Sequence, residues 1–388
     1  MSNKHYDVIV VGVGSMGAPT CYNLAIRGAK VLGLEQFGIV HENGSHAGQS
    51  RMVRKAYFEN PDYVPLLDTA YTLWTDLEDI TGHKLFHKTG LFYTGPKHNE
   101  LLEGVKLSAQ KYNITINNLT ERECLQQFPS FKLIENYEYL FEPDAGYVIP
   151  EQIIRLYTEL AKSKGATILE NQLVETWSDS NNVVTVRTNT ATFTADKIIF
   201  TAGGFTNNLL PSQKNSLVPR RQITCWFQPK KPSLFSSENF PCFLYSTPDL
   251  PGAFYGFPLL STGDTKGNMG IKVGYHYPGE AIDPYTLHNF NHSKESRLIK
   301  EFMQSYIPEG YMSVLSTKSC IYTYTEDGNF ILENHKDYQS VSVACGFSGH
   351  GFKLAPLVGE ILADLCLEGK TKHPIGFLSS NRFNTKML

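Results

Sequence analysis

The sequence feature that most constrains the fold is a motif of three spaced glycines, G-x-G-x-x-G, close to the start of the chain. Gly12-Val13-Gly14-Ser15-Met16-Gly17 directly follows an apolar run, 6–11, that has the composition of a buried parallel strand. A helical pattern continues to about residue 27, and a second apolar run ends on Glu35. A strand, a glycine-rich turn, a helix and a second strand predict a βαβ unit that binds a dinucleotide.

Each position of this motif has a physical role in binding a pyrophosphate. Gly12 permits the tight turn, Gly14 lets the backbone approach the phosphates, and Gly17 allows close packing of the helix, whose N-terminus stabilises the phosphate charge. Glu35 lies 18 residues after Gly17, where its carboxylate can accept hydrogen bonds from both ribose hydroxyls. The predicted dinucleotide-binding residues are Gly12, Gly14, Ser15, Met16, Gly17 and Glu35.

The polar segment after the second strand distinguishes FAD from NAD, which the glycines alone do not. NAD-binding domains generally continue with regular βα units. Here a glycine-rich polar loop, 38–48, follows the second strand and includes Gly44-Ser45-His46-Ala47-Gly48, with Arg51 shortly after it. Because this loop arrives beside the βαβ crevice, FAD is the cofactor that the sequence favours.

The pattern of apolar residues changes twice along the rest of the chain. Helical spacing at 63–80 gives way after about residue 85 to short β-type runs, and a helix at 151–164 followed by apolar strands returns to the first topology. From 222 to about 322, β-type runs punctuated by Pro and Gly predict an antiparallel sheet. We predict an α/β plus α+β fold, with a Rossmann-type FAD-binding domain over 1–84, 148–221 and 322–388 and a discontinuous substrate domain over 85–147 and 222–321.

Composition narrows the classes of partner. The net charge of −3, without a long basic run, argues against nucleic acid, and the apolar run at 6–11 is too short for a signal sequence or a membrane span. Seven cysteines without a CxxC pair fit reduced thiols, so we expect a cytoplasmic protein and no metal site. The final Lys386-Met387-Leu388 resembles a peroxisomal signal only loosely.

Five ordered blocks, together with the opening βαβ unit, carry a resemblance that runs nearly end to end. The chain resembles the monomeric sarcosine oxidase family, which includes N-methyltryptophan oxidase and the animal pipecolate and sarcosine oxidases. The blocks are Asn43-Gly44-Ser45-His46 with Arg51 and Arg54, Tyr255-Gly256-Phe257-Pro258, Lys272-Val273-Gly274-Tyr275-His276, Cys320-Ile321-Tyr322-Thr323-Tyr324-Thr325 with Asp327 and Phe330, and Gly346-Phe347-Ser348-Gly349-His350-Gly351-Phe352-Lys353.

The resemblance implies both a fold and a reaction. The FAD-binding domain would be of the glutathione reductase type, and the protein would be a monomer. Flavin would take a hydride from a small secondary amino acid such as sarcosine, the imine would hydrolyse, and oxygen would be reduced to hydrogen peroxide. Sarcosine would yield formaldehyde. The alternatives are a cyclic imino acid such as pipecolate or proline, or a dehydrogenase that passes electrons to an acceptor other than oxygen.

Roles around the flavin are also implied by the resemblance. Cys320 matches the cysteine that forms a thioether with the flavin 8α-methyl group, and Cys345 is the competing candidate. Arg51 matches a flavin-adjacent arginine, and the turn 346–351 should bring backbone N–H groups to the flavin pyrimidine. The further residues predicted to bind the cofactor are Ser45, Val174, Gly346, Gly349, His350, Gly351 and Lys353.

Roles around the substrate follow in the same way. Arg54 and Lys353 match the pair that holds the substrate carboxylate, where two cations give charge-assisted hydrogen bonds. Tyr255 and Tyr322 match aromatic residues that shield the reacting centre from water. The close bacterial sarcosine oxidases carry a histidine at the positions of Ala47 and Asn329, so these two departures bear on which substrate is used.

Strand alternation makes a further prediction about Lys272 and His276. If 270–275 is a strand, these two side chains lie on one face, and Ile271, Val273 and Tyr275 lie on the other. Two basic groups would then face one cavity. By resemblance, Lys272 promotes oxygen reduction by stabilising the negative charge that develops, and His276 lines the substrate cavity, where it could act as a general base.

Overall fold

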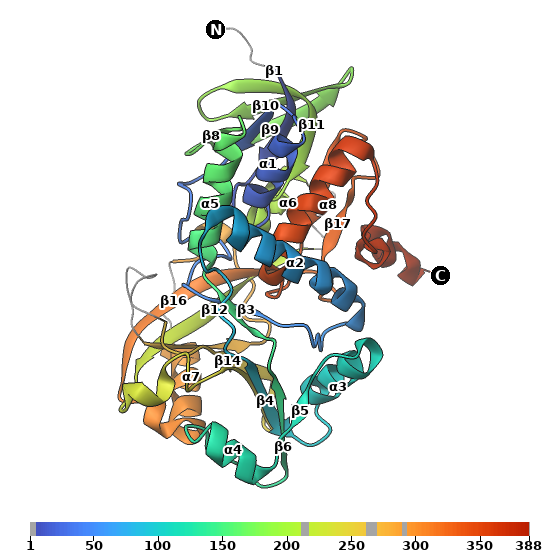
Figure 1. The fold of residues 1–388 in the computed structure, drawn as a ribbon. Helices are drawn as coiled ribbons and strands as arrows, with labels where there is room; N and C mark the ends of the chain where they lie inside the picture. Colours follow the sequence, from blue (N-terminus) through green and yellow to red (C-terminus); the bar gives the residue numbers. More distant parts are fainter. Residues whose placement is uncertain (1–4, 211–216, 261–269, 289–292, 388) are drawn as a thin grey trace.

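Two large sheets, joined by connections that pass between them, form the protein (Figure 1). The computed structural model describes residues 5–210, 217–260, 270–288 and 293–387. The first sheet has the strand order β17-β18-β11-β1-β2-β8, and the antiparallel hairpin β9–β10 extends from β11. Its strands are β1 (His5–Val11), β2 (Val31–Leu34), β8 (Thr167–Leu169), β9 (Val174–Ser180), β10 (Val183–Thr188), β11 (Thr192–Phe200), β17 (Ile331–Asn334) and β18 (Val341–Cys345).

Parallel pairing in the centre of this sheet confirms the predicted nucleotide-binding fold. β1 pairs in parallel with β2 on one side and with β11 on the other, and β11 pairs in parallel with β18. Val8 and Val10 pack under the helices, whereas Ile9 and Val11 pack on the opposite face against the β9–β10 hairpin. This alternation buries both faces, so the strand reads as a continuous apolar run. The carboxyl ends of β1, β2 and β11 therefore meet beside the glycine turn.

Helices cover one face of the first sheet. α1 packs between α5 and α8, and α2 packs across α8 (Figure 1). No helix in the described part of the chain is long and apolar enough to cross a membrane. The helices of this layer are α1 (Gly17–Ile26), α2 (Val64–Thr81), α5 (Pro150–Ser163) and α8 (Ala355–Glu368), and α6 (Thr206–Leu209) is a short helix that follows β11.

The second sheet has the order β16-β12-β15-β14-β13-β4-β6-β5 and is antiparallel except for the pair β13–β4. An aromatic core separates one of its faces from α7. The strands are β4 (Leu91–Pro96), β5 (Asn117–Asn118), β6 (Tyr137–Glu142), β12 (Val218–Gln228), β13 (Cys242–Thr247), β14 (Leu250–Gly256), β15 (Ile271–His276) and β16 (Ser313–Tyr324), and the helices are α3 (Glu100–Tyr112), α4 (Glu121–Gln127) and α7 (Ser293–Tyr306).

The connections between the two sheets run through the predicted domain boundaries. β3 (Arg51–Val53) pairs with β7 (Gly146–Val148) where the chain enters and leaves the second sheet. The boundaries at 221/222 and 321/322 fall within β12 and β16, whose ends reach toward the first sheet. The domain division remains a prediction. Short 3-10 helices occupy Pro61–Tyr63, Gly203–Phe205, Pro232–Phe235, Pro284–Thr286, Pro308–Gly310, Phe352–Leu354, Gly376–Leu378 and Ser380–Met387.

Candidate functional site

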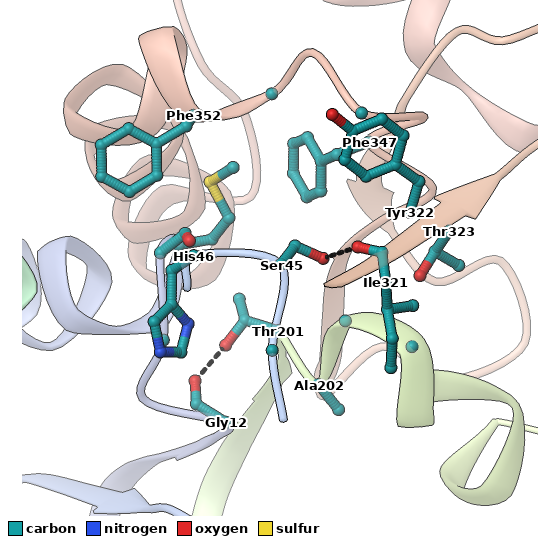
Figure 2. A pocket seen from close by; sticks show the side chains of 18 of the residues that line it. Gly12, Ser45, His46, Thr201, Ala202, Ile321, Tyr322, Thr323, Phe347 and Phe352 are labelled. Atoms are coloured by element: carbon teal, nitrogen blue, oxygen red, sulfur yellow. Dashed lines mark hydrogen bonds between the residues drawn. The ribbon is translucent and has the colours of Figure 1, made fainter. Parts of the chain in front are cut away.

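A deep pocket extends from the glycine turn of the first sheet to the face of the second sheet (Figure 2). Most of the predicted site residues lie on its wall. Those on the wall are Gly12, Gly14, Ser15, Met16, Glu35, Ser45, Arg51, Arg54, Val174, Tyr255, His276, Tyr322, Gly346, Gly349, His350, Gly351 and Lys353. The predicted residues that do not line it are Gly17, Lys272 and Cys320.

The three glycines of the turn differ in what a side chain would meet. Gly12 has a φ of +90°, and a Cβ there would lie 2.7 Å from the carbonyl oxygen of Thr201, whose hydroxyl also donates to Gly12 O (Figure 2). A Cβ at Gly17 would lie 1.8 Å from the same Gly12 oxygen. At Gly14 the nearest atom is Nδ1 of His46, at 3.8 Å. Close packing therefore requires glycine at positions 12 and 17, whereas the open space beside Gly14 fits a pyrophosphate.

Two further features of the turn suit a dinucleotide. α1 begins without a side-chain cap and has no acidic residue in its first turn, so its positive end faces the pocket uncompensated. The buried carboxylate of Glu35 accepts from Val13 N at 2.8 Å and from Phe37 N at 3.0 Å, which fixes its orientation on the pocket wall. A carboxylate has about four acceptor sites, so capacity remains for ribose hydroxyls.

Arg51 organises the loop that passes over the pocket. Its guanidinium donates to Ser50 O and Ala47 O, each at 2.7 Å, and to Ser45 O. The Ser45 hydroxyl donates to Ile321 O at 2.6 Å, which ties the loop to β16 (Figure 2). These contacts give Arg51 a structural role, and the cofactor-binding and catalytic roles that the family resemblance implies for it remain predictions.

Cys320 lies in β16 at the side of this loop. Its side chain is buried, and burial raises the pKa of the thiol, while the positive charges of Arg51 and Lys272 lower it. Cys345 is buried in the core of the first sheet, and burial and Glu333 raise the pKa of its thiol further. Burial has the larger effect, so the pKa of the thiol is raised overall, and the two charges limit how much of the nucleophilic thiolate is lost.

Lys272 is buried under the same loop and not on the pocket wall. Its Nζ donates to Ser50 O at 2.8 Å and lies 4.9 Å from the centre of the Phe257 ring. Burial, reinforced by Arg51, lowers the lysine pKa well below its usual value. The alternation predicted for 270–275 matches β15, because its odd-numbered residues Ile271, Val273 and Tyr275 pack in the core of the second sheet.

The end of the pocket that is lined by the second sheet contains His276 and two tyrosines. The hydroxyl groups of Tyr255 and Tyr322 lie 3.4 Å apart, and the His276 ring lies 5.9 Å from the Tyr322 ring. Burial lowers the pKa of His276 to about 4; Glu59 opposes this effect, and nearby cations reinforce it. His276 is therefore a neutral imidazole at pH 7.

Two buried cations, Arg54 and Lys353, converge on a single aromatic ring. The Arg54 Cζ lies 4.6 Å and the Lys353 Nζ lies 4.9 Å from the centre of the Tyr57 ring, and both cations line the pocket with about 3% and 4% exposure. Burial and the charge of Arg54 lower the pKa of Lys353 to about 7, although Glu59 acts in the opposite direction. The sequence did not indicate Tyr57, since no periodic pattern separates it from an ordinary core tyrosine.

A carboxylate of the protein already pairs with Arg54. Both oxygens of Glu59 accept from Arg54 Nη2, at 2.6 and 2.7 Å. Burial acts to raise the pKa of Glu59, but Arg54, His350 and Lys353 lower it to about 2. A substrate carboxylate must therefore share the cation with Glu59 or displace it. Sequence reasoning missed Glu59, and its only signal was its position five residues after Arg54.

The turn 346–351 joins the two ends of the pocket. Gly349 has a φ of +84°, and a Cβ there would lie 2.3 Å from the Tyr322 ring, so glycine is required for both conformation and space. The carbonyl of His350 accepts from Lys353 Nζ at 2.6 Å. The short 3-10 helix Phe352–Leu354 follows the turn and leads into α8, and its residues Phe352 and Lys353 line the pocket. The turn thus positions a substrate-side cation against the start of a helix.

Sequence comparison identifies relatives over nearly the whole chain. Residues 7–365 match the family described as DAO, FAD dependent oxidoreductase. Monomeric sarcosine oxidase of Bacillus sp. (strain B-0618) is 38% identical over 98% of this chain and 97% of its own length. N-methyl-L-tryptophan oxidase of Yersinia pestis (strain Pestoides F) is 31% identical over 97% of this chain and 99% of its own length.

Solved structures share the fold. NikD, described as an unusual amino acid oxidase essential for nikkomycin biosynthesis, superposes with a TM-score of 0.86 at 23% identity and covers 97% of both chains. L-proline dehydrogenase from P. horikoshii superposes with a TM-score of 0.85 at 21% identity and covers 100% of both chains. The predicted fold class and cofactor, FAD, are confirmed at the level of the family. The chain belongs to the DAO family of FAD-dependent oxidoreductases.

Proposed function

We propose that this protein is an oxidase of a small secondary amino acid, with sarcosine as the first candidate and a cyclic imino acid such as pipecolate or proline as the second. The observation that carries the proposal is the pair of buried cations, Arg54 and Lys353, on the wall of one pocket. Glu59 already pairs with Arg54, whereas the hydrogen bond described for Lys353 goes to the carbonyl of His350. A substrate carboxylate bound beside both groups would gain charge-assisted hydrogen bonds from them. The 38% identity to a monomeric sarcosine oxidase supports the same class of substrate.

FAD fits the other end of the pocket through the residues described above. Gly14 and the uncapped start of α1 would hold the pyrophosphate, and Glu35 would hold the ribose. When bound, FAD supplies the acceptor for the hydride that leaves the carbon next to nitrogen, and it returns the electrons to oxygen. The N-terminal end of α8 would place positive potential beside the flavin.

The side chains between these two ends would prepare the substrate. Arg54 and Lys353 would fix the carboxylate, so that the carbon bearing the nitrogen has one orientation. Tyr255 and Tyr322 would exclude water from that carbon, and the neutral His276 could accept a hydrogen bond from the substrate amine. Lys272, beneath the loop 45–50, would stabilise negative charge that develops as oxygen is reduced.

A substrate panel tests the proposal. Hydrogen peroxide release and oxygen uptake by the purified holoenzyme would be measured with sarcosine, N-methyltryptophan, pipecolate, proline and dimethylglycine. We expect turnover of at least one secondary amino acid with equal consumption of oxygen. Turnover of none of them would refute the substrate class, and turnover only with an artificial electron acceptor would make the protein a dehydrogenase.

We also propose that the flavin is attached covalently at Cys320. The supporting observations are its position in β16 next to Ile321, which lines the pocket, and the charges of Arg51 and Lys272, which limit the rise in the pKa of its thiol. Acid precipitation of the wild type should retain the yellow chromophore in the pellet, and Cys320→Ser should release it to the supernatant. Cys345→Ser is the matched control and should retain it. Release from the wild type would refute the attachment.

A further inference from the structure

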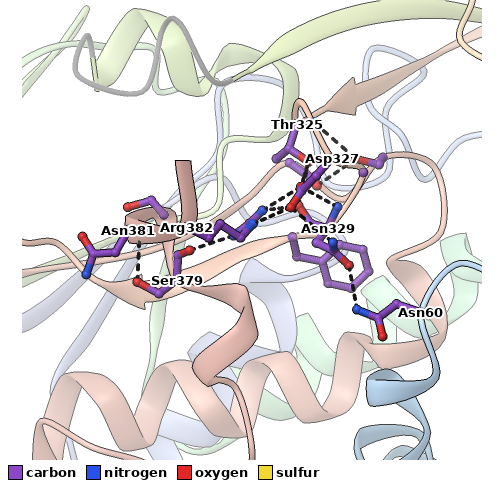
Figure 3. Close-up of polar contacts among 12 residues, drawn as sticks. Asn60, Thr325, Asp327, Asn329, Ser379, Asn381 and Arg382 are labelled. Carbon is purple, nitrogen blue, oxygen red and sulfur yellow. Dashed lines mark hydrogen bonds and ion pairs between the residues drawn. The ribbon is translucent and has the colours of Figure 1, made fainter. Parts of the chain in front are cut away.

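The segment 379–382 is hydrogen-bonded to the turn 325–329, which leads into β17 (Figure 3). Arg382 makes a bidentate ion pair with Asp327, with Nε to Oδ2 at 2.8 Å and Nη2 to Oδ1 at 3.1 Å. Its Nη2 also donates to Asn329 O at 2.8 Å, and its Nη1 donates to Ser379 O at 2.9 Å. The planar guanidinium of Arg382 thus donates to four acceptors, which fixes the orientation of the segment 379–382 relative to the turn as well as neutralising Asp327.

Asp327 closes the turn, 325–329, to which Arg382 is attached. Its Oδ1 accepts from Asn329 N at 3.0 Å and from the Thr325 hydroxyl at 3.2 Å (Figure 3). Burial acts to raise the pKa of Asp327, but Arg382 and Asn329 lower it to about 2. The carboxylate is therefore charged at every pH in ordinary use, and the contact with Arg382 does not titrate.

The turn holds the imidazole of His350. His350 Nε2 lies 3.0 Å from Gly328 O, and because a carbonyl only accepts, Nε2 must carry the proton. Burial lowers the pKa of His350 to about 3, so the ring is neutral and its Nδ1 is an acceptor. The partner of Nδ1 is the hydroxyl of Tyr57. The turn thus sets the tautomer of His350 and, through it, the position of the Tyr57 hydroxyl.

His350 and Tyr57 in turn hold the two cations of the pocket. Lys353 Nζ donates to His350 O at 2.6 Å, and the rings of His350 and Tyr57 lie 5.5 Å apart. Tyr57 contacts both Arg54 and Lys353 through its ring. The turn has a second link to the pocket, since Asn60 Nδ2 lies 3.4 Å from Asn329 Oδ1 and Asn60 directly follows Glu59 (Figure 3).

We infer that Arg382 is a positioning residue for the carboxylate-binding end of the site, acting through the turn 325–329, His350 and Tyr57. The acceptors described for its guanidinium belong to Asp327, Asn329 and Ser379, none of which is among the predicted contacts of substrate or flavin. This inference rests on the proposed function only in naming the ligand as a carboxylate. Loss of Arg382 should therefore weaken binding of the carboxylate group and leave the pyrophosphate end of the pocket, around Gly14 and Glu35, unchanged.

Titration of the holoenzyme with acetate, followed by the flavin absorbance, tests the inference without a turnover assay. In Arg382→Gln the Kd for acetate should rise about fivefold, a typical effect of a residue that couples to a site without contacting it. Kd for acetamide, which has the same shape without the charge, should be unchanged. Arg297→Gln, which removes an exposed ion pair with Glu301, is the matched control and should leave both constants unchanged.

Three further measurements distinguish a positioning role of Arg382 from a general loss of folded structure in the variants. Arg382→Lys keeps the charge but loses the fork, so its Kd for acetate should fall between the wild type and Arg382→Gln. Asp327→Asn should give the same increase as Arg382→Gln, and the double variant should show no further increase. With an active substrate, KM should rise while kcat stays within about twofold.

The results of these titrations can be distinguished from a failure of the proposed substrate class. An acetate Kd unchanged in both Arg382 variants, or equal losses of acetate and acetamide binding, would overturn the inference. Additive effects of Asp327→Asn and Arg382→Gln would overturn the route through the turn. If the wild type oxidises no secondary amino acid but the acetate results hold, the substrate proposal fails and the positioning role stands.

Discussion

Replacing Lys353 with methionine should stabilise the protein at acidic and neutral pH, while it removes half of the proposed carboxylate site. Lys353 is 4% exposed, and its pKa falls from the usual 10.5 to about 7, mainly because of burial. Below pH 7 the folded protein must hold a buried ammonium that an unfolded chain would leave in water. Methionine has a similar length and no charge, so it removes this cost.

The magnitude follows from the two pKa values. A folded-state pKa of about 7 against 10.5 in the unfolded chain destabilises the fold by about 5 kcal/mol at pH 6 and by about 1.5 kcal/mol at pH 9.5. The lysine pKa is lower in the folded protein than in the unfolded chain, so the unfolded chain binds more protons between pH 7 and 10.5. The free energy of unfolding therefore rises with pH in that window. The stability gained by Lys353→Met should therefore be about 3 kcal/mol larger at pH 6 than at pH 9.5.

Urea unfolding of the holoenzyme at the two pH values measures this difference. The lost hydrogen bond from Lys353 to His350 O lowers the stability of the variant similarly at both pH values, so it cancels from the comparison. Lys370→Met, at an exposed position, is the matched control and should show no such dependence on pH. A gain that is equal at pH 6 and pH 9.5, within about 0.5 kcal/mol, would refute the reasoning about the buried ammonium.

Three further predictions concern the glycine turn, the resident carboxylate and the imidazole. Gly14→Ala should fold with wild-type stability yet lose FAD, whereas Gly12→Ala, with its φ of +90°, should unfold more easily, and a flavin spectrum with thermal unfolding separates the two. Glu59→Gln leaves Arg54 without its anion and should lower the free energy of unfolding by about 3 kcal/mol, and saturating acetate should restore part of it in a Tm measurement. Because the pKa of His276 is about 4, kcat/KM of His276→Gln should follow the same pH profile as the wild type between pH 6 and 9. An ionisation that appears in the wild-type profile in this range and is missing from that of the variant would contradict the prediction.

Sequence reasoning was most accurate where local signals agree with the tertiary structure. The βαβ unit, the helix at 63–80 and the helix at 151–164 were predicted to within a few residues, because apolar periodicity and glycine chemistry both act over short distances. β9 (Val174–Ser180) was not predicted, because five of its seven residues are polar or charged and most of it is exposed at the end of a hairpin.

In the candidate site, too, local motifs could be read from the sequence and long-range contacts could not. Its residues could be predicted where a motif matched a family, as for Arg54 and Lys353, which both line the pocket. The contacts of these cations could not be predicted. Glu59 pairs with Arg54 only because the chain turns back on itself, and Arg382 reaches Asp327 across 55 residues, so neither leaves a local pattern.

The strand order of the first sheet has a consequence for biosynthesis. β11 receives its parallel neighbour β18 only after about 140 further residues have been translated, and α8, which covers the same sheet, comes later still. Until then a nascent chain carries an open strand edge and an uncovered apolar face, both of which favour aggregation. The turn 346–351 lines the pocket and is translated after β18, so the pocket is not complete until that turn has left the ribosome. We therefore expect flavin to bind late in folding, after the first sheet has closed.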